Sequence, residues 1–483
     1  MNSYPVSKVE PKATMDSSAS LEFAKKTKKS ICTPQKIRIC IVIIAILILL
    51  IIGVITYIFV SRQNASSSSN PITVLFIPIG SIPTSVSISS SASTSVSTSV
   101  STSVSISIST PTSVSTSTPA SVSNRNGSGM STTSSNTQCQ ILKFSPYRSY
   151  STGSKPWSLA IADLNNDNAN DIAVVNANDP SVGIYLNYGN GSVKVASVVS
   201  TGSYSVFVTA GDFNKDNNAD LVVAQASANS LGMFRGIGNG SFNTRIDLPV
   251  GSYPYGVSNG DFNGDGHLDL VAVNDYDNTA SILLGFSNGT FKNNTVVSTG
   301  SYVTAVVTAD FNNDNYLDFA ATDYSSNTVS VFIGFGNGSF QQRRPYSTGT
   351  SPWGITVGDF NKDNYVDIVT TNYKDSSISL LYNNGNGTFQ SQIKYKTGYY
   401  PMSVAVGDLN HDTNIDIVVP TANDNYMTIF LNSGNGTFGN VMNLTGDWQL
   451  SSVGIADLNG DGRLDIVATS IWNQTLNIFL NSC

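Results

Sequence analysis

Histidine is almost absent from this chain, because only two of its 483 residues are histidines, His267 and His411. Histidine is the most frequent general acid or base in enzymes. Both histidines lie inside the repeated acidic loops described below, so neither a Ser/His/Asp set nor a Cys/His set can be assembled with confidence. A carboxylate pair of the glycosidase type is the remaining catalytic option. We expect that the protein is not an enzyme, and we keep a membrane-anchored enzyme acting on carbohydrate as the alternative.

Charge of either sign is also scarce. Charged residues make up 12% of the chain, with 25 Lys and Arg against 32 Asp and Glu, which gives a formal net charge of −7. The sequence contains neither a dense basic patch nor a nucleic-acid-binding motif. We therefore expect no nucleic-acid partner.

What the chain has in abundance is one nonapeptide, D-[FL]-N-x-D-x-x-x-D, which we call the Asp loop. The spacing of its seven copies is constant, since (457 − 163)/6 = 49 residues. A fixed period in this range is typical of repeat architectures. Three Asp in each of seven loops account for 21 of the 32 acidic residues, so the acidity belongs mainly to these loops. The copies begin at Asp163, Asp212, Asp261, Asp310, Asp359, Asp408 and Asp457.

The chemistry of the Asp loop suits calcium. Oxygen-bearing side chains stand at positions 1, 3, 5 and 9, with the same spacing as ligands in an EF-hand loop. The Glu at position 12 of an EF-hand is missing here. Apolar β-type runs flank each copy, which favours a loop closing a β-hairpin. Asp and Asn are also ordinary turn residues, but seven copies in register favour up to seven Ca²⁺ sites. The predicted ligands are Asp163, Asn165, Asp167, Asp171, Asp212, Asn214, Asp216, Asp220, Asp261, Asn263, Asp265, Asp269, Asp310, Asn312, Asp314, Asp318, Asp359, Asn361, Asp363, Asp367, Asp408, Asn410, Asp412, Asp416, Asp457, Asn459, Asp461 and Asp465.

The segments DFNGDGHLDLVAVN and DLNGDGRLDIVATS resemble the FG-GAP/VCBS repeat family, which builds the β-propellers of integrin α-subunit heads and of some fungal lectins. The resemblance covers residues 139–483. It implies an all-β, seven-bladed, calcium-binding propeller. The first two copies depart from the pattern, with Asn170 and Ala219 where an apolar residue is usual.

Each 49-residue unit contains four short apolar runs separated by Gly, Asn and Asp turns, as in a propeller blade. Phe144 corresponds to Phe438 six repeats later, which predicts that the chain begins with a fourth strand, while its end stops after a third. Residues 140–482 make 7 × 49 = 343 residues. We expect the N-terminal strand to complete the last blade, and Cys139 and Cys483, which flank this stretch, to form a disulfide.

The residues before the repeats predict a membrane anchor. Residues 1–38 are polar and end in a group of cations, and the uncharged residues 39–60 are long enough to span a bilayer. The excess of cations before this span predicts a cytosolic tail at 1–38, so the protein is expected to be a single-pass, type II protein of the cell membrane. Residues 61–138 are rich in Ser and Thr, which predicts a glycosylated, mucin-like stalk; an aggregation-prone β-strand is the alternative.

Two cysteines and several asparagines are candidates for modification. Cys32 and Cys40 lie at the cytosolic edge of the predicted span and are either palmitoylated or unmodified thiols. Asn-Gly is first of all a hairpin turn signal, but the G-N-G-[ST] turns are also glycosylation sequons. The repeated sequons are at Asn190, Asn239, Asn288, Asn337, Asn386 and Asn435.

Strand parity places the Asp loops and the G-N-G turns on one face, and the fourth-to-first and second-to-third connections on the other. Tyr and Trp dominate binding hot spots, which makes the second face the expected site for an extracellular glycan or protein ligand. The protein is thus expected to be a cell-surface recognition or adhesion protein, with a structural surface coat as an alternative. Trp157 and Trp353 belong either to this site or to the packing between blades. The candidate ligand-binding residues are Tyr204, Tyr253, Tyr255, Asp275, Tyr302, Tyr324, Tyr373, Tyr400 and Trp472.

Overall fold

The computed structural model describes residues 141–292 and 295–483. The predicted tail (1–38), membrane segment (39–60) and stalk (61–138) therefore lie outside the described residues. Within the described ranges, no helix is long and apolar enough to cross a membrane. One helical turn is present among these residues, the 3-10 helix η2 (Ala226–Ala228).

Seven antiparallel sheets of four strands make up the fold, and we number them as blades 1 to 7. Blade 1 consists of β2 (Pro156–Ala162), β3 (Asp171–Asn176), β4 (Ser181–Asn187) and β5 (Val193–Ser200). Blade 2 consists of β6 (Ser205–Gly211), β7 (Asp220–Gln225), β8 (Ser230–Phe234) and β9 (Ile246–Pro249). Blade 3 consists of β10 (Pro254–Gly260), β11 (Asp269–Asn274), β12 (Thr279–Leu283) and β13 (Thr295–Ser298).

The remaining blades repeat this order. Blade 4 consists of β14 (Val303–Ala309), β15 (Asp318–Asp323), β16 (Thr328–Phe332) and β17 (Arg344–Ser347). Blade 5 consists of β18 (Pro352–Gly358), β19 (Asp367–Asn372), β20 (Ser377–Leu381) and β21 (Ile393–Lys396). Blade 6 consists of β22 (Ala405–Gly407), β23 (Asp416–Pro420), β24 (Tyr426–Leu431) and β25 (Asn440–Thr445). Blade 7 consists of β26 (Leu450–Ala456), β27 (Asp465–Ser470), β28 (Thr475–Phe479) and β1 (Arg148–Ser151).

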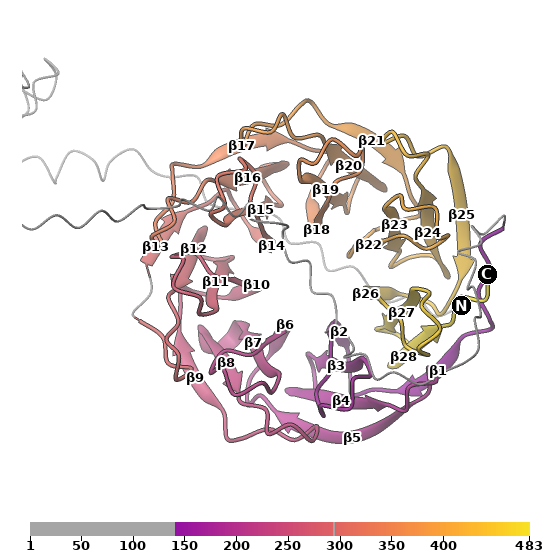
Figure 1. Cartoon of the computed structure of the whole chain (residues 1–483), viewed down its shortest axis with the longest axis horizontal. Helices are drawn as coiled ribbons and strands as arrows, with labels where there is room; N and C mark the ends of the chain where they lie inside the picture. Colours follow the sequence, from indigo (N-terminus) through magenta and orange to yellow (C-terminus); the bar gives the residue numbers. More distant parts are fainter. Residues whose placement is uncertain (1–140, 293–294) are drawn as a thin grey trace, which may run out of the picture. The chain divides into compact units, whose positions relative to one another are not determined.

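The blades form a ring in which the first strand of each blade is innermost and the fourth is outermost (Figure 1). The ring closes as the sequence predicts, because β1 pairs with β28 and thus supplies the outer strand of blade 7. The predicted all-β, seven-bladed propeller is therefore confirmed. Since every sheet is completed by strands from within the described residues, the propeller needs no strand from elsewhere in order to fold.

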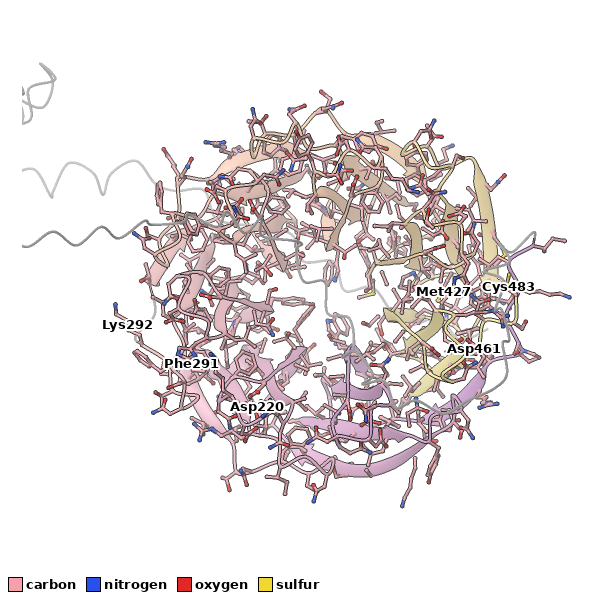
Figure 2. All side chains as sticks on the ribbon, viewed as in Figure 1. Asp220, Phe291, Lys292, Met427, Asp461 and Cys483 are labelled. Atoms are coloured by element: carbon pink, nitrogen blue, oxygen red, sulfur yellow. The ribbon has the colours of Figure 1, made fainter. Side chains whose placement is uncertain are left out.

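The second strands are buried on both faces, as their continuous apolar sequences predict. Every residue of β3, β7, β11, β15, β19, β23 and β27 is buried. Side chains fill the spaces between blades (Figure 2). Because neighbouring blades share these contacts, the core consists of clusters between sheets and not of one central mass.

The second residue of each Asp loop joins one blade to the next. Phe262 of blade 3 packs edge-on against Phe340 of blade 4, with ring centroids 5.5 Å apart. The same contact joins Phe311 to Phe389 in the following pair, at 5.4 Å. Leu409 of blade 6 and Phe144 belong to one cluster, so the seam between the two ends of the chain repeats the ordinary contact between blades.

Most of the fourth strands are shorter than the apolar runs of the sequence predict, but β5 is an exception, because it begins at Val193, directly after the G-N-G turn. A strand starting at Phe291 is expected, but β13 begins at Thr295, and Phe291 forms an isolated bridge with Gly285. Phe144 likewise forms only a bridge, and β1 begins at Arg148. These aromatic rings point into the contact between blades. Their packing there separates the residues that precede β13 and β1 from the regular outer strands.

Candidate functional site: an aromatic face and seven Asp loops

Three aromatic rings from alternate blades meet near the centre of the ring of blades. Trp157 lies in β2, Tyr255 in β10 and Trp353 in β18. The ring centroids of the two tryptophans are 6.4 Å apart, and Tyr255 contacts Trp353 edge-on at 5.6 Å. The two tryptophans thus contact one another across the ring, between blades 1 and 5, and not between adjacent blades.

A chain of tyrosines extends this cluster outward. Trp353 contacts Tyr324 and Tyr373, at 5.5 and 5.4 Å between ring centroids, and Tyr373 contacts Tyr400 at 4.8 Å. On the other side, Tyr302 lies 5.2 Å from Tyr324. We call the whole set the aromatic face, and it comprises Trp157, Tyr204, Tyr253, Tyr255, Tyr276, Tyr302, Tyr324, Trp353, Tyr373 and Tyr400.

The backbone beneath the tyrosines is held in an unusual conformation. Tyr253, Tyr302 and Tyr400 have φ values of 57°, 60° and 55°, in the left-handed region that bulky residues rarely adopt. The backbone N–H of Tyr253 donates to Asn229 Oδ1 at 2.9 Å, and its carbonyl accepts from Asp275 N at 3.0 Å. These bonds join a fourth-to-first connection to a second-to-third loop, so the two kinds of loop lie on one face.

Two lysines and one aspartate bring charge to this aromatic surface. Lys155 Nζ lies 4.5 Å from the ring centroid of Trp157 and donates to the Tyr204 hydroxyl at 2.9 Å. Lys374 Nζ lies 5.3 Å from the ring centroid of Tyr324. Asp275 is 2% exposed, and its burial raises the pKa of its carboxyl to about 6.

Tyr253 and Tyr302 are neutral at physiological pH. Burial, followed by the nearby Tyr204, Tyr276, Tyr302 and Asp275 groups, raises the pKa of Tyr253 to about 12. Burial likewise raises the pKa of Tyr302 above its ordinary value. These rings therefore offer hydroxyl groups and π-faces but no negative charge of their own.

Most of the predicted ligand-binding residues come together in this cluster, but one does not. Trp472 is 70% exposed and has no aromatic contact in the described part of the chain. The sequence-based prediction missed Tyr276, Lys155 and Lys374. Tyr276 stands in a loop already identified as part of this face, and each lysine occupies a repeat position where another blade has tyrosine, so the repeat alignment contained the signal.

A cavity of about 170 Å³ lies against the innermost strands below this cluster. Its lining includes the three converging rings of Trp157, Tyr255 and Trp353, together with Phe207 and Met402. The aromatic face is thus continuous with a cavity of mixed polar and apolar lining that is large enough for several water molecules.

The Asp loops lie on the opposite side of the blades, together with the G-N-G turns. The amide of Gly191, in a G-N-G turn of blade 1, donates to the carbonyl of Leu458, in the Asp loop of blade 7, at 2.8 Å. The amide of Gly240 makes the equivalent bond to Leu164, at 2.9 Å. The sequons within these turns are exposed.

Within an Asp loop the first carboxylate organises the backbone. In blade 3, Asp261 Oδ1 accepts from Gly264 N and Oδ2 from Gly266 N, both at 2.7 Å. Asn263 Nδ2 donates to Asp265 Oδ2 at 2.9 Å. Gly264 and Gly266 have φ values of 72° and 77°, which glycine adopts without strain.

The ninth residue of the loop is a buried aspartate that links the loop to the end of the third strand, and we call it the latch residue. Asp269 Oδ2 accepts from Phe262 N at 2.8 Å, and Oδ1 accepts from Gly285 N, at the end of the third strand, at 2.7 Å. Burial raises the pKa of Asp269 to about 6, against the lowering effect of the two backbone hydrogen bonds, and the charges of Asp261 and Asp265 raise it further. All seven ninth residues make the same pair of bonds, and Asp220 is labelled in Figure 2.

The side chains of the loops carry the kind of ligand atom that calcium prefers. All four side chains carry hard oxygen atoms, and the charges of the first and fifth residues act on the ninth in every repeat. Across residues 141–292 and 295–483, no three His, Cys, Asp or Glu side chains converge in a ready-made metal site. The carboxylates are engaged with backbone amides as described, so the calcium sites stay a prediction.

The predicted disulfide also stays a prediction, because Cys139 lies outside the described residues. Backbone hydrogen bonds join the two ends of the described propeller. Ser145 N donates to Leu480 O at 2.8 Å, and Ser482 N donates to Lys143 O at 2.9 Å. The two ends of the described propeller therefore lie side by side, as a bond between Cys139 and Cys483 requires.

The model of the FG-GAP-like repeat matches residues 163–223, 212–272, 261–321, 310–370, 360–419 and 420–468. The chain belongs to the FG-GAP-like repeat family. This agrees with the resemblance seen in the sequence, and the structure adds a seventh blade to the six matched segments. No curated protein sequence matches the chain.

Comparison with solved structures finds similar chains among other proteins. BBS1N, crystallised in complex with ARL6DN, has 11% sequence identity and a TM-score of 0.53, over 70% of this chain and 97% of that chain. An Agrocybe aegerita lectin that recognises non-reducing terminal N-acetylglucosamine has 20% identity and a TM-score of 0.47, over 61% of this chain and 81% of that chain. At 11% identity the likeness to BBS1N concerns the fold alone.

Proposed function

We propose that this FG-GAP-like propeller is a cell-surface recognition or adhesion domain whose aromatic face binds an extracellular glycan or protein ligand. The observation that carries the proposal is the continuous contact of aromatic rings contributed by blades 1, 3, 4, 5 and 6. Tyr302 and Tyr400 remain 39% and 40% exposed, so a ligand can reach them. Rigid aromatic rings give a large contact area at low entropic cost.

The backbone supports the same proposal. Left-handed conformations at bulky residues cost of order 1–3 kcal/mol each and cluster at functional sites. Tyr253, Tyr302 and Tyr400 occupy one repeat position on this face. Lys155, Ser351 and Gln449 have the same conformation at that position, so it belongs to the connection between blades and fixes the direction of whichever side chain stands there. The three tyrosines are held there by hydrogen bonds between loops, so the rings are presented in fixed positions before any ligand binds.

The remaining predictions belong to the same proposal. Residues 39–60 would anchor the protein as a type II membrane protein, and residues 61–138 would hold the propeller away from the membrane as a glycosylated stalk. Ca²⁺ would be held by the oxygens of the Asp loops, of which Asp261, Asn263, Asp265 and Asp269 form one set. A bound cation offsets the repulsion between the three carboxylates of each loop.

The test uses the propeller, residues 139–483, on a glycan array and on intact cells. Tyr253→Ala and Tyr373→Ala should abolish binding. Phe335→Ala is the matched control, because Phe335 is an aromatic residue that is 54% exposed in a G-N-G turn on the opposite face. Binding that survives both tyrosine changes but is lost in the control variant would show that the ligand uses the face of the Asp loops.

A further inference from the structure

One carboxylate on the aromatic face lacks any partner. Both carboxylate oxygens of Asp275 are buried without a hydrogen-bond partner among the residues that the structure describes. Buried carboxylates are normally paired or hydrogen-bonded, because removing the charge from water is unfavourable. Most other buried aspartates of the propeller obey this rule, since all seven latch residues accept two backbone amides each.

The other six blades show that the fold does not require this carboxylate. Asp275 donates its backbone amide to the carbonyl of Tyr253 at 3.0 Å, and the equivalent residues of other blades make the same bond, as Tyr324 does to Tyr302 at 2.8 Å. At the position of Asp275 the other blades have Ala177, Ala226, Tyr324, Tyr373, Ala422 and Ile471. None of these side chains is a carboxylate, so the backbone arrangement forms without one.

The surroundings of Asp275 are aromatic. Tyr276 stacks on Tyr253, with ring centroids 4.4 Å apart and planes at 9°. Asp275 is tied to this group by its backbone amide, which donates to the Tyr253 carbonyl, and no hydroxyl of the described residues donates to its carboxylate. Tyr276 is 67% exposed, so one side of this group of rings faces solvent.

The same face holds ammonium groups on its rings elsewhere. Lys155 lies over Trp157 in blade 1, and Lys374 lies over Tyr324 at the boundary of blades 4 and 5. Tyr253 occupies the repeat position of Lys155, and Tyr276 that of Lys374. Blade 3 therefore has rings where those blades have lysines, and it has a carboxylate in addition. Its own chain supplies no cation to that carboxylate within the described ranges.

We propose that Asp275, with the rings of Tyr253 and Tyr276, forms a subsite for an alkylammonium group of the ligand. An ammonium donates charge-assisted hydrogen bonds to a carboxylate and is attracted to aromatic faces, so it complements both components of the subsite. This inference rests on the proposed function of the aromatic face and specifies the chemistry that it recognises. The group can come from a lysine side chain of a protein or from the free amine of an amino sugar.

Calorimetric titration of the propeller, residues 139–483, tests the subsite with two matched pairs of probes. Nα-acetyl-lysine methylamide is compared with its Nε-acetylated form, and methyl glucosaminide with methyl N-acetylglucosaminide. We expect the charged member of at least one pair to bind and its neutral partner to bind about tenfold more weakly or not at all. The pair that responds identifies the source of the amine. Binding of neither charged probe would overturn the proposal.

Two variants separate recognition from folding. Asp275→Asn should weaken binding of the charged probe about tenfold or more, yet raise the melting temperature, because it removes a buried charge without a partner. Asp247→Asn removes an exposed charge on the outer strand β9, whose carboxylate pairs with Arg245, and should leave probe binding unchanged. Equal binding by wild type and Asp275→Asn, or a lower melting temperature of that variant, would contradict the subsite.

The outcome also distinguishes this inference from the proposed function. If cells or glycans bind the propeller in a manner that depends on Tyr373 but not on Asp275, the aromatic face is the ligand site and the ammonium subsite is wrong. If Tyr373→Ala binds like wild type while the charged probes still require Asp275, the subsite exists outside the main ligand site. Different measurements therefore test the two proposals.

Discussion

At the scale of the residue, two classes of buried aspartate have opposite environments. The latch residues, such as Asp269, accept hydrogen bonds from two backbone amides each, whereas the carboxylate of Asp275 accepts none from the residues that the structure describes. Burial raises the pKa of both, but only the latch carboxylates receive compensating hydrogen bonds. Removal of the two side chains should therefore affect stability in opposite directions.

For the latch, we predict that Asp269→Ala lowers stability by about 3 kcal/mol, because two amides lose a charged acceptor, each bond being worth roughly 1.5–3 kcal/mol. Asp265→Ala in the same loop is the control, since Asp265 is exposed. Urea unfolding of both variants in EDTA excludes any contribution from calcium. Equal losses in the two variants would show that the latch bonds contribute nothing specific.

For Asp275, the sign of the pH effect follows from its raised pKa. A carboxyl whose folded-state pKa is about 6, above its ordinary value of 3.8, is harder to ionise in the folded protein. Its contribution is zero below about pH 4, becomes destabilising as the pH rises to about 6, and is constant above that. Because one pKa unit corresponds to about 1.4 kcal/mol, the full effect is at most about 3 kcal/mol.

We therefore predict that Asp275→Asn and wild type have similar stability near pH 4 and that the variant becomes the more stable of the two by pH 7. Urea unfolding of both proteins across this range measures the difference directly. The tyrosines that face Asp275 do not titrate in this window, since burial raises the pKa of Tyr253 and Tyr302 above the ordinary value of 10. A constant difference between pH 4 and 7 would rule out the unpaired carboxylate as its source.

At the scale of the element, each Asp loop connects a first and a second strand and also touches the neighbouring blade. Asn383 Nδ2 of blade 5 donates to the carbonyl of Phe311, in the Asp loop of blade 4, at 2.8 Å. Asn432 makes the equivalent bond to Phe360 at 2.8 Å. A change in the loop is therefore transmitted to the contact between blades.

We predict that calcium stabilises the blades through these loops. Three carboxylates in one turn repel one another without a cation, so EDTA should lower the melting temperature of the propeller and added Ca²⁺ should restore it. Differential scanning calorimetry with EDTA, and then with excess Ca²⁺ or Mg²⁺, measures the effect; Mg²⁺ should restore less, because it requires near-octahedral geometry. A melting temperature that ignores chelator would contradict calcium binding.

At the scale of the whole molecule, the ring is closed by β1, which is separated from its partner β28 by more than 300 residues in sequence. The contact that joins other blades is repeated at this seam, where Leu409 and Phe144 share a cluster. Tyr147 adds a further contact by donating to Asp447 Oδ1 at 3.0 Å. Opening the seam should therefore weaken blade 7 before the others.

A disulfide between Cys139 and Cys483 should prevent this opening. Closing a loop of about 340 residues stabilises by up to roughly 6 kcal/mol in the chain-entropy model. Peptide mapping without reductant should find the two cysteines joined, and Cys483→Ser should lower the melting temperature as much as reduction of the wild type does. Free thiols at both positions would contradict the bond.

The sequence by itself determined the number of blades, the strand that closes the ring and the loops that carry the acidic residues. These features follow from a period of 49 residues, which repeats the same local pattern of turns and apolar runs in every blade. The repeat alignment also placed most of the aromatic residues on one face, because strand parity alone decides on which face a loop emerges. Local chemistry was sufficient in each case.

Only the tertiary structure decided which of those aromatic residues contact one another and which hydrogen bonds the carboxylates accept. Trp157 and Trp353 are 196 residues apart, and they come into contact because closing the ring brings the inner strands of distant blades together. The latch role of Asp269 depends on an amide sixteen residues later, at the end of another strand. Asp275 is charged where the other repeats have Ala, Tyr or Ile, and its lack of a hydrogen-bond partner among the described residues follows from the packing around it.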